Sequence, residues 1–304
     1  MLFRSVVIGW ISVGTRKANL SRLQAFKEGM TSFGWKEGAN YILEERWAEA
    51  DYERLPEVAR EIAGRKPAVV VATPTVAARE MHGVAPNLPI VLASGDPIVV
   101  GLSNSLAKPS GMVTGVSNIN VELGAKLVEL LRDASPKVRQ VGVLVDGKAS
   151  ALLTKERMAV LQQAAAATKI QLVIGQVFQL SEVDAALSSL AKRGAQALIV
   201  PPSSILNSDR PRIAKFALAN GWPLVAGEPE YADAGALAAY SADRVAMYRR
   251  AAYFVDRLLK GAKVSDLPIE QPMYFETIVN LRTAKALGIK VPPIVMVRAT
   301  RVIE

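Results

Sequence analysis

Two segments of the sequence place an acidic residue between a glycine and a proline, directly after an apolar run. In LPIVLASGDPIVVGL, residues 88–102, Asp96 follows an expected buried strand at 90–93, and in WPLVAGEPEY, residues 222–231, Glu228 has the same position. The carboxyl ends of parallel strands form the edge of an open α/β sheet where ligands bind. A carboxylate at this edge accepts hydrogen bonds from an ammonium or a hydroxyl group. The pair therefore predicts two similar half-sites; in the alternative interpretation, the aspartate closes its own turn.

Hydroxyl groups follow two other expected strands. Thr73-Pro74-Thr75 and Ser203-Ser204 each stand between a strand and a helix, so hydroxyls and the free amides of a helix start should meet at the same edge. Such groups attract carboxylates or phosphates, and simple helix capping is the alternative. Further candidate ligand contacts near strand ends are the polar residues Ser12, Ser94 and Asn118 and the aromatic residues Trp10 and Tyr240. The aromatic pair could stack on an apolar ligand, although core packing is equally compatible with Trp10.

Several kinds of chemistry lack the residues they need. The chain has no cysteine and one histidine, His82, so disulfides and thiolate chemistry are excluded and a zinc site or a histidine-based triad has little support. Residues 142–149 match the G-x4-G-K spacing of a phosphate loop, but Ala149 replaces the required serine or threonine. The net charge of +9 is dispersed, without a basic run of five. We therefore expect no cofactor, no metal and no nucleic acid partner.

Length and composition predict a globular protein with two domains. The chain has 304 residues, half of them hydrophobic, which is enough for two cores. No apolar run approaches the roughly 18 residues of a transmembrane helix. At the N-terminus one arginine precedes a short apolar run that fits a first strand, and no small-residue cleavage site follows. A secretory signal is therefore not expected in this chain.

The expected elements alternate between strand and helix, and the pattern occurs twice. In the first half, strands are expected at 6–10, 41–47, 69–72, 90–93 and 113–117, with helices at 19–33 and 121–131 and a helix capped by Asp51. In the second half, strands at 141–145, 172–177 and 197–200 alternate with helices at 152–168, 182–192 and 210–220. Pro74 aligns with Pro202 and Pro89 with Pro223. A helix at 244–260 and a strand-like segment at 271–281 follow the repeat.

This repeat predicts an α/β fold of two similar lobes, each a doubly wound parallel sheet with helices on both faces. The segments beyond the repeat are most simply explained if the chain crosses between the lobes three times, near 117–120, 241 and 280. Several crossings side by side form a multi-strand hinge, with a ligand cleft between the lobes. We expect one lobe at 1–117 and 243–279, and the other at 118–242 and 280–304.

Many short segments together carry a resemblance to a known family. They are 24–29, 34–41, 46–49, 95–97, 101–102, 113–115, 248–252, 269–272 and 284–288. In these segments the chain resembles the ABC-transporter substrate-binding proteins of the tryptophan/tyrosine-binding type. The resemblance covers nearly the whole chain and implies a type I periplasmic-binding-protein fold, a ligand held between the lobes and delivery to a membrane permease. It also implies a monomer without enzymatic activity that is periplasmic or extracellular and lipid-anchored.

The expected ligand is a small carboxylate-bearing solute. The hydroxyls and helix-start amides favour an anionic group, and Asp96 and Glu228 favour a cationic one, so we expect an aromatic or aliphatic amino acid first. Amino-acid-binding members often carry an Asp-Asn pair where this chain has Pro202-Ser203-Ser204, and Met112 stands where the family commonly has an asparagine. Because the Asp-Asn pair is missing, the deaminated acid is the second candidate. Two other classes remain open at this point. One is the effector-binding domain of a transcriptional regulator without its DNA-binding part, and the other is an enzyme that uses Asp96 and Glu228 as paired carboxylates.

Overall fold

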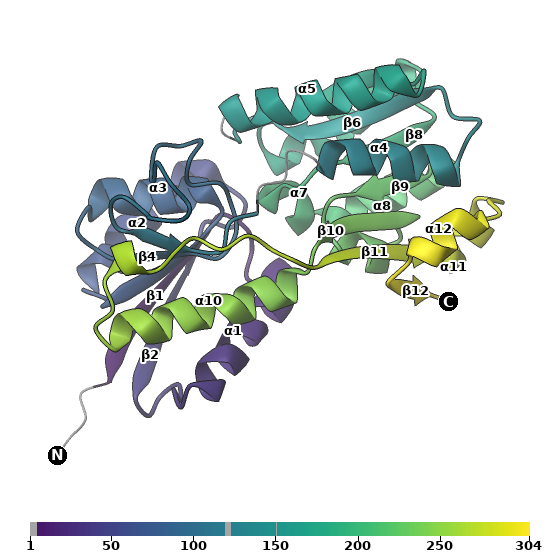
Figure 1. Cartoon of the computed structure of the whole chain (residues 1–304). Coiled ribbons are helices and arrows are strands. Elements are labelled where there is room, and N and C mark those ends of the chain that lie inside the picture. The colour runs from purple at the N-terminus through teal and green to yellow at the C-terminus, as the bar shows by residue number, and fades with distance from the viewer. Residues whose placement is uncertain (1–4, 119–122, 150) are drawn as a thin grey trace. The chain divides into compact units, whose positions relative to one another are not determined.

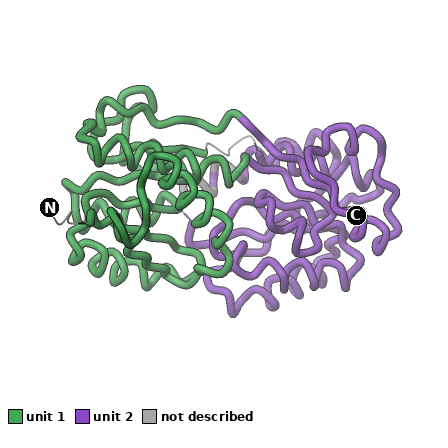
Figure 2. Tube along the Cα trace, turned by 90° about the horizontal axis from the view of Figure 1, so that it is seen from below, with its two compact units in different colours: residues 1–119, 243–273 green, residues 120–242, 274–304 purple. Residues whose placement is uncertain are grey.

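The chain folds into two compact units, coloured separately in Figure 2. The computed structural model describes residues 5–118, 123–149 and 151–304, without the side chains of 151–154, 156 and 157. Unit 1 comprises residues 1–119 and 243–273, and unit 2 comprises 120–242 and 274–304. The first crossing, which the sequence placed near 117–120, lies at the edge of the described residues. The third falls at 273/274 rather than at the expected 279/280, because β11 (Phe275–Asn280) pairs with β10 (Ala238–Ala242) of unit 2.

The sheet of unit 1 has five parallel strands in the order β2-β1-β3-β4-β5. Its apolar, β-branched runs are buried on both faces, as expected for strands of a parallel sheet; all five residues of β3 are buried. The strands are β1 (Val6–Ser12), β2 (Tyr41–Trp47), β3 (Val69–Thr73), β4 (Ile90–Leu92) and β5 (Val113–Gly115). Compared with the sequence expectations, β1 continues two residues beyond its expected end at Trp10, and β5 ends two residues before its expected end at Ser117.

Two pairs of helices cover this sheet, α1 with α10 and α2 with α3 (Figure 1). A Cβ at Gly9 would meet Ile62 of α2, whereas Trp10 packs on Phe26 of α1, so the pairs lie on opposite faces. Besides three short 3-10 turns, at Lys17–Asn19, Tyr52–Arg54 and Val264–Asp266, the helices are α1 (Leu20–Ser32), α2 (Leu55–Gly64), α3 (Thr75–Val84) and α10 (Arg244–Leu259). Asp51 caps the turn before α2, since its carboxylate accepts from Glu53 N.

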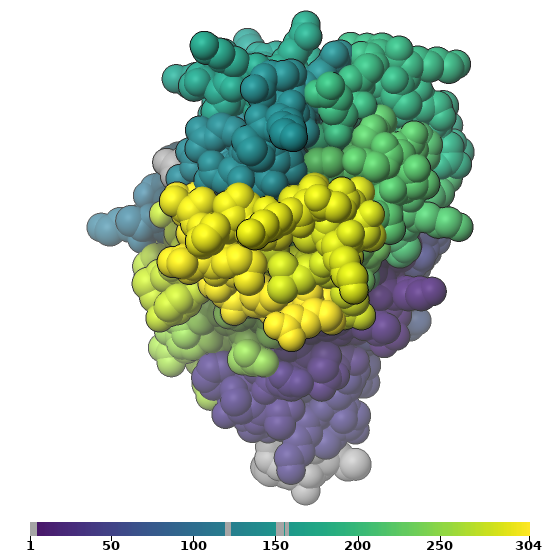
Figure 3. All heavy atoms as spheres, turned by 90° about the vertical axis from the view of Figure 1, so that its right-hand side faces the viewer, coloured from purple at the N-terminus to yellow at the C-terminus, as the bar shows by residue number. Residues whose placement is uncertain are grey.

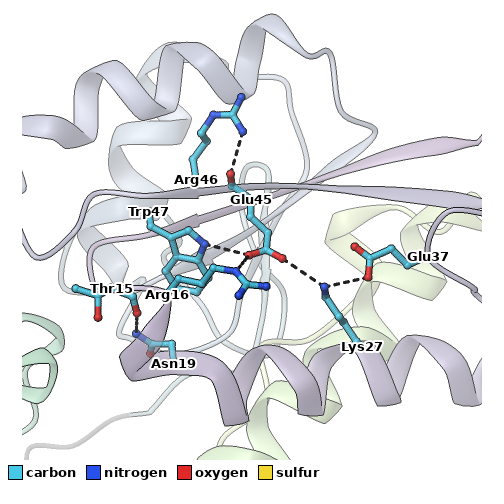
Figure 4. A network of polar contacts seen from close by, with 8 residues as sticks. All are labelled: Thr15, Arg16, Asn19, Lys27, Glu37, Glu45, Arg46 and Trp47. Atoms are coloured by element: carbon cyan, nitrogen blue, oxygen red, sulfur yellow. Dashed lines mark hydrogen bonds and ion pairs between the residues drawn. The ribbon is translucent and has the colours of Figure 1, made fainter.

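A half-buried acid joins β2 to α1 (Figure 4). Glu45 of β2 accepts from Arg16 Nε at 2.7 Å and Trp47 Nε1 at 3.1 Å, and Lys27 Nζ lies 3.3 Å away. Burial opposes ionisation of Glu45, but the hydrogen bonds from Arg16 and Trp47 and the positive charges outweigh it and lower its pKa. Lys27 also pairs with Glu37 at 2.9 Å. The network therefore holds an ionised carboxylate between strand and helix.

Unit 2 repeats the strand order of unit 1 and then extends it. Its sheet runs β12-β11-β10-β9-β8-β6-β7, so β7-β6-β8-β9-β10 has the connectivity of β2-β1-β3-β4-β5. This shared order explains the repeat in the sequence. The added β11 is antiparallel to β10, so the sheet is mixed rather than fully parallel. The remaining strands are β6 (Gln140–Asp146), β7 (Gln171–Val177), β8 (Ala197–Val200), β9 (Leu224–Ala226) and β12 (Arg301–Ile303).

The helices expected at 152–168, 182–192 and 210–220 are confirmed to within one residue at each end, whereas the short helices at 204–208 and 230–233 were not predicted. The helices of unit 2 are α4 (Leu123–Ala134), α5 (Ala151–Ala167), α6 (Val183–Lys192), α7 (Ser204–Ser208), α8 (Arg210–Ala219), α9 (Glu230–Asp233), α11 (Leu281–Ala286) and α12 (Pro293–Arg298), with a 3-10 turn at Leu180–Glu182. The expected start of α4, at 121, lies outside the described residues. α12, in yellow in Figure 3, lies against α4, where Arg298 pairs with Asp133 at 3.1 Å. The core of the unit forms between α4, α5 and the sheet.

Candidate functional site

Both sheets have a point where the strand order reverses, between β1 and β3 in unit 1 and between β6 and β8 in unit 2. At such a point the connections leave to opposite faces, which opens a crevice at the carboxyl ends of the strands where ligands bind. Ser12 and Thr73 are paired in register at this end of β1 and β3. Asp146 and Val200 end β6 and β8. Asp96 and Glu228 follow β4 and β9, so the two expected half-sites lie at the same sheet edges, one strand away from these points.

In unit 1 the loop after β4 brings several of the predicted residues together. Asp96 N donates to Thr75 Oγ1 at 2.8 Å, and Asn118 N donates to Gly95 O at 3.0 Å. Gly95 has a φ of 138°, and a Cβ there would collide with Thr75 Oγ1, so only glycine allows this approach. Pro74, joined to Thr73 by a cis peptide bond, precedes α3. The predicted residues on this edge are Ser12, Thr73, Pro74, Thr75, Ser94, Asp96 and Asn118.

Asp96 has the turn-closing contacts of the alternative interpretation. Its Oδ1 accepts from Ile98 N at 3.0 Å and from Val99 N at 3.3 Å, and the residue is 6% exposed. These bonds fix the loop that follows β4. A ligand role for Asp96 would have to be compatible with this structural one.

Helix α10 is attached to the same edge by two side chains that the sequence did not single out. Tyr248 Oη and Thr73 Oγ1 lie 2.7 Å apart, and Arg244 Nη1 donates to Ser94 Oγ at 2.8 Å. Arg244 is 2% exposed. The sequence offered little signal for either residue, because both are about 150 residues or more from their partners.

Trp10 does not end its strand, and its ring is a core residue. It is fully buried and packs on Phe26, Trp47 and Tyr248 with ring centroids 5.4 to 5.8 Å apart. The interpretation that Trp10 lies at the sheet edge, as a stacking surface, was therefore wrong, because β1 continues to Ser12 and these three rings surround the indole. Its Nε1 has no hydrogen-bond acceptor among the described residues.

Unit 2 has a small, partly open pocket at its switch point, with a volume of about 30 Å³. Its lining comes from β6, α5 and the segment after β8, and consists of Val145, Asp146, Ala149, Met158, Leu161, Pro201, Pro202 and Ser203. Ser203 Oγ donates to Asp146 Oδ2 at 3.0 Å and accepts from Leu206 N at 3.2 Å, which caps α7. Asp146 Oδ1 accepts from Lys148 N at 3.0 Å. Sequence reasoning missed Asp146, whose only local signal is its position at the end of an apolar strand, directly before Gly147.

Two of the other predicted residues of unit 2 follow strands, whereas Tyr240 lies in the middle of β10 and not at its expected end. Ser204 begins α7, and Glu228 is 5% exposed just after β9. Burial, followed by the negative charge of Glu228, raises the pKa of Tyr231 well above its usual value. Tyr240 is half-buried on β10 and its ring stacks on Phe275, with centroids 5.9 Å apart. Glu228 and Tyr240 thus belong to unit 2, as the sequence placed them.

The described part of the chain contains neither a metal cluster nor a membrane-spanning helix. In residues 5–118, 123–149 and 151–304, no group of three or more His, Asp or Glu side chains is arranged to hold a metal ion. Within the same ranges, no helix combines the length and apolar character needed to cross a membrane.

Two α/β units with the same strand order, each with polar side chains at its switch point, define a bilobal binding protein of the type I periplasmic class, which confirms the predicted fold. The sequence matches the family described as ABC transporter substrate binding protein over residues 11–303. The chain belongs to this family.

Individual relatives agree with this assignment. The chain is 28% identical to a tyrosine-binding protein of Clostridioides difficile, over 88% of this chain and 76% of the relative. Among solved structures, a conserved domain protein of Vibrio cholerae matches with a TM-score of 0.90 and 23% identity, covering 98% of this chain and 100% of that one. An ABC domain in complex with L-Trp from Streptococcus pneumonia matches with a TM-score of 0.89 and 22% identity, covering 99% and 100%. At these identities the structures show the fold alone.

Proposed function

We propose that this chain is the solute-binding component of an ABC import system and that it captures one small carboxylate-bearing solute between its two units by hinge closure. An amino acid, aromatic first, is the leading candidate, and a related organic acid is the second. The names of a tyrosine-binding relative and of a similar structure with L-Trp support this order. The observation that carries the proposal is the pair of matching switch points within a chain of this family.

The chemistry of the two edges is suited to a zwitterion. On unit 1, α3 begins directly after Thr73-Pro74, so the amides of its first turn and the Thr75 hydroxyl offer hydrogen-bond donors to a carboxylate. On unit 2, Glu228 offers a carboxylate for an ammonium group. Asp96 of unit 1 offers a second carboxylate, whose Oδ1 also closes its own loop. The pocket beside Ser203 offers apolar walls from Met158 and Leu161.

The proposed partner is the membrane permease of an ABC transporter, and the proposed location is the periplasm or the outer face of a membrane to which the chain is attached by a lipid. The chain would act as a monomer, without catalysis. It would release the solute to the permease when the units open. Three crossings between the units are compatible with such hinge motion.

A thermal-shift panel tests the proposed ligand class. The panel contains aromatic and aliphatic amino acids, their deaminated acids, neutral sugars and polyamines. A ligand at 100-fold its dissociation constant adds about 2.7 kcal/mol to the free energy of unfolding, which gives a clear rise in melting temperature. We expect this rise with at least one carboxylate. Stabilisation by sugars or polyamines alone would reject the ligand class.

A further inference from the structure

A short turn after β4 in unit 1 starts with the capping bonds of a helix. Asp96 precedes it, and its Oδ1 accepts from Ile98 N at 3.0 Å and from Val99 N at 3.3 Å. These groups are two and three residues after the acid, which are the positions that a helix N-cap side chain binds. Pro97 stands between, where a helix tolerates a residue without an amide hydrogen. One carboxylate therefore fixes the start of the turn.

The same turn also ends as a helix does. Gly101 N donates to Ile98 O at 3.0 Å, and Leu102 N donates to Pro97 O at 2.9 Å. With the positive φ of 73° at Gly101, these two bonds form a Schellman motif. Glycine suits this position because side chains disfavour positive φ. A turn that is capped at both ends holds the residues between the caps in one conformation.

The residues between the caps are apolar and reach the surface. Ile98 is 36% exposed, and Val99 and Val100 are partly buried. All three are β-branched, which is unfavourable in a helical turn. Both the turn and its surface position therefore favour other residue types. Positions where the sequence departs from local preference in this way are expected at functional sites.

The corresponding turn of unit 2 shows that the fold does not require such a surface. The second Gly-acid-Pro segment, 227–229, follows β9 as the first follows β4, and α9 continues from it. Glu230 there has the position of Ile98. The next two residues, Tyr231 and Ala232, are buried at 1% and 0% exposure. The exposed apolar turn is therefore a property of unit 1, and the shared strand order does not account for it.

The turn lies at the carboxyl edge of its sheet, beside donors that suit a carboxylate. Asp96 N donates to Thr75 Oγ1 at 2.8 Å, so the acid that caps the turn is also bonded to the first residue of α3. Ligands of open α/β sheets bind at this edge. An apolar surface next to a few polar groups is the composition typical of small-molecule sites.

We propose that Ile98, Val99 and Val100 form an apolar subsite that contacts the side chain of the captured solute. Asp96 and Gly101 are positioning residues that hold this subsite in shape. A surface that is rigid before binding avoids the cost of becoming ordered. The inference rests on the proposed function and deepens it, since it makes the solute an amino acid with a large apolar side chain.

The test replaces all three apolar residues with threonine, which keeps the branched Cβ and adds a hydroxyl group. Isothermal titration calorimetry compares L-tryptophan, L-tyrosine and L-alanine on the wild type and on the triple variant Ile98→Thr, Val99→Thr, Val100→Thr. Apolar contacts with a substrate side chain contribute about 10- to 200-fold per methylene group. We therefore expect binding of the preferred aromatic amino acid to weaken by about 10-fold or more. L-Alanine is too small to fill the subsite and should bind the two proteins equally weakly.

Two substitutions at Gly101 test the positioning role. The Cβ position of this residue has open space around it, so a substitution acts through the backbone conformation and not through a collision. Gly101→Val should weaken binding of the aromatic amino acid, because a β-branched residue disfavours positive φ. Gly101→Asn should preserve it, because asparagine tolerates this conformation. Equal affinities of the two variants would overturn the positioning role.

Ile42→Thr is the matched control, because Ile42 is 44% exposed on β2, which is three strands away from β4. Its affinities should stay within about 2-fold of wild type. Melting temperatures identify variants that fail to fold. Val99→Thr, which changes one residue to its isostere, then replaces the triple variant and should show a smaller loss of the same selectivity.

Two results for a folded variant overturn the apolar subsite alone: unchanged affinity for the aromatic amino acid, or an equal loss for L-alanine. A wild type that binds L-alanine as tightly as the aromatic amino acids also overturns it. A wild type that binds no carboxylate overturns the proposed function as well.

Discussion

Thr73 Oγ1 and Tyr248 Oη lie 2.7 Å apart in unit 1, although 175 residues separate them in the sequence. Together with the bond from Arg244 to Ser94, this contact attaches α10 to the ends of β3 and β4. α10 follows directly after a crossing between the units. The sequence marked Thr73 and Ser94 as candidate ligand contacts. Their side chains also attach α10 to the edge of the sheet.

Removal of the Tyr248 hydroxyl should destabilise the fold. In Tyr248→Phe the buried Thr73 hydroxyl loses its partner, which should cost about 1–3 kcal/mol of unfolding free energy in chemical denaturation. Thr73→Val combined with Tyr248→Phe should cost less than the sum of the single changes, because both partners are then removed. Tyr274→Phe, at a residue that is 70% exposed, is the control and should change little. Strictly additive losses would show that the two hydroxyls are not coupled.

Gly29 should be essential for the packing of α1 on α10. A Cβ at this position would lie 2.6 Å from Arg249 O and 2.7 Å from Ala252 Cβ, so Gly29→Ala should separate the helices and cost about 1–3 kcal/mol or more. Gly64, also helical, has open space around its Cβ position. Gly64→Ala should therefore stabilise the chain by about 0.4–1 kcal/mol. Similar effects of the two substitutions on thermal unfolding would be incompatible with this packing.

Glu45 should make stability depend on pH in the acidic range. Its pKa is lowered in the folded state, so its contribution is present above the unfolded value of about 4.3 and disappears as the pH falls through the lower folded value. Glu45→Gln should therefore be less stable than wild type at pH 7, and the difference should close below about pH 4. The same titration on Glu57→Gln, an exposed position, is the control. A stability gap that persists at low pH would exclude this mechanism.

Two substitutions separate the structural and ligand roles of Asp96. Asp96→Asn keeps an oxygen that can accept from the amides of Ile98 and Val99, whereas Asp96→Ala removes it. If the residue only closes its loop, alanine should lower stability by about 1–2 kcal/mol while asparagine preserves both stability and ligand affinity. Calorimetry and melting curves on both variants measure this. A large loss of affinity in Asp96→Asn, with normal melting, would instead assign the charge to the ligand.

The sequence predicted the architecture well because parallel strands and their helices leave local signals. Buried runs such as 69–73 and the breaks after them placed the strands, and the repeated Gly-acid-Pro turns marked equivalent positions in two units of equal strand order. The site was harder to predict. A tryptophan such as Trp10 fits a ligand site and a protein core equally well, and Arg244 meets Ser94 only when the chain folds. Contacts between distant segments have no local signature.

Small-angle scattering tests the central claim that both units capture one solute. The radius of gyration is measured on the purified chain without ligand and with saturating L-tyrosine or L-tryptophan, whichever stabilises it in the thermal-shift panel. Closure around a solute buries it against both units, so the account predicts a smaller radius in the bound state. L-Tryptophanamide at the same concentration is the control and should leave the radius unchanged. A radius that stays constant although calorimetry shows the binding site to be saturated would contradict capture by hinge closure.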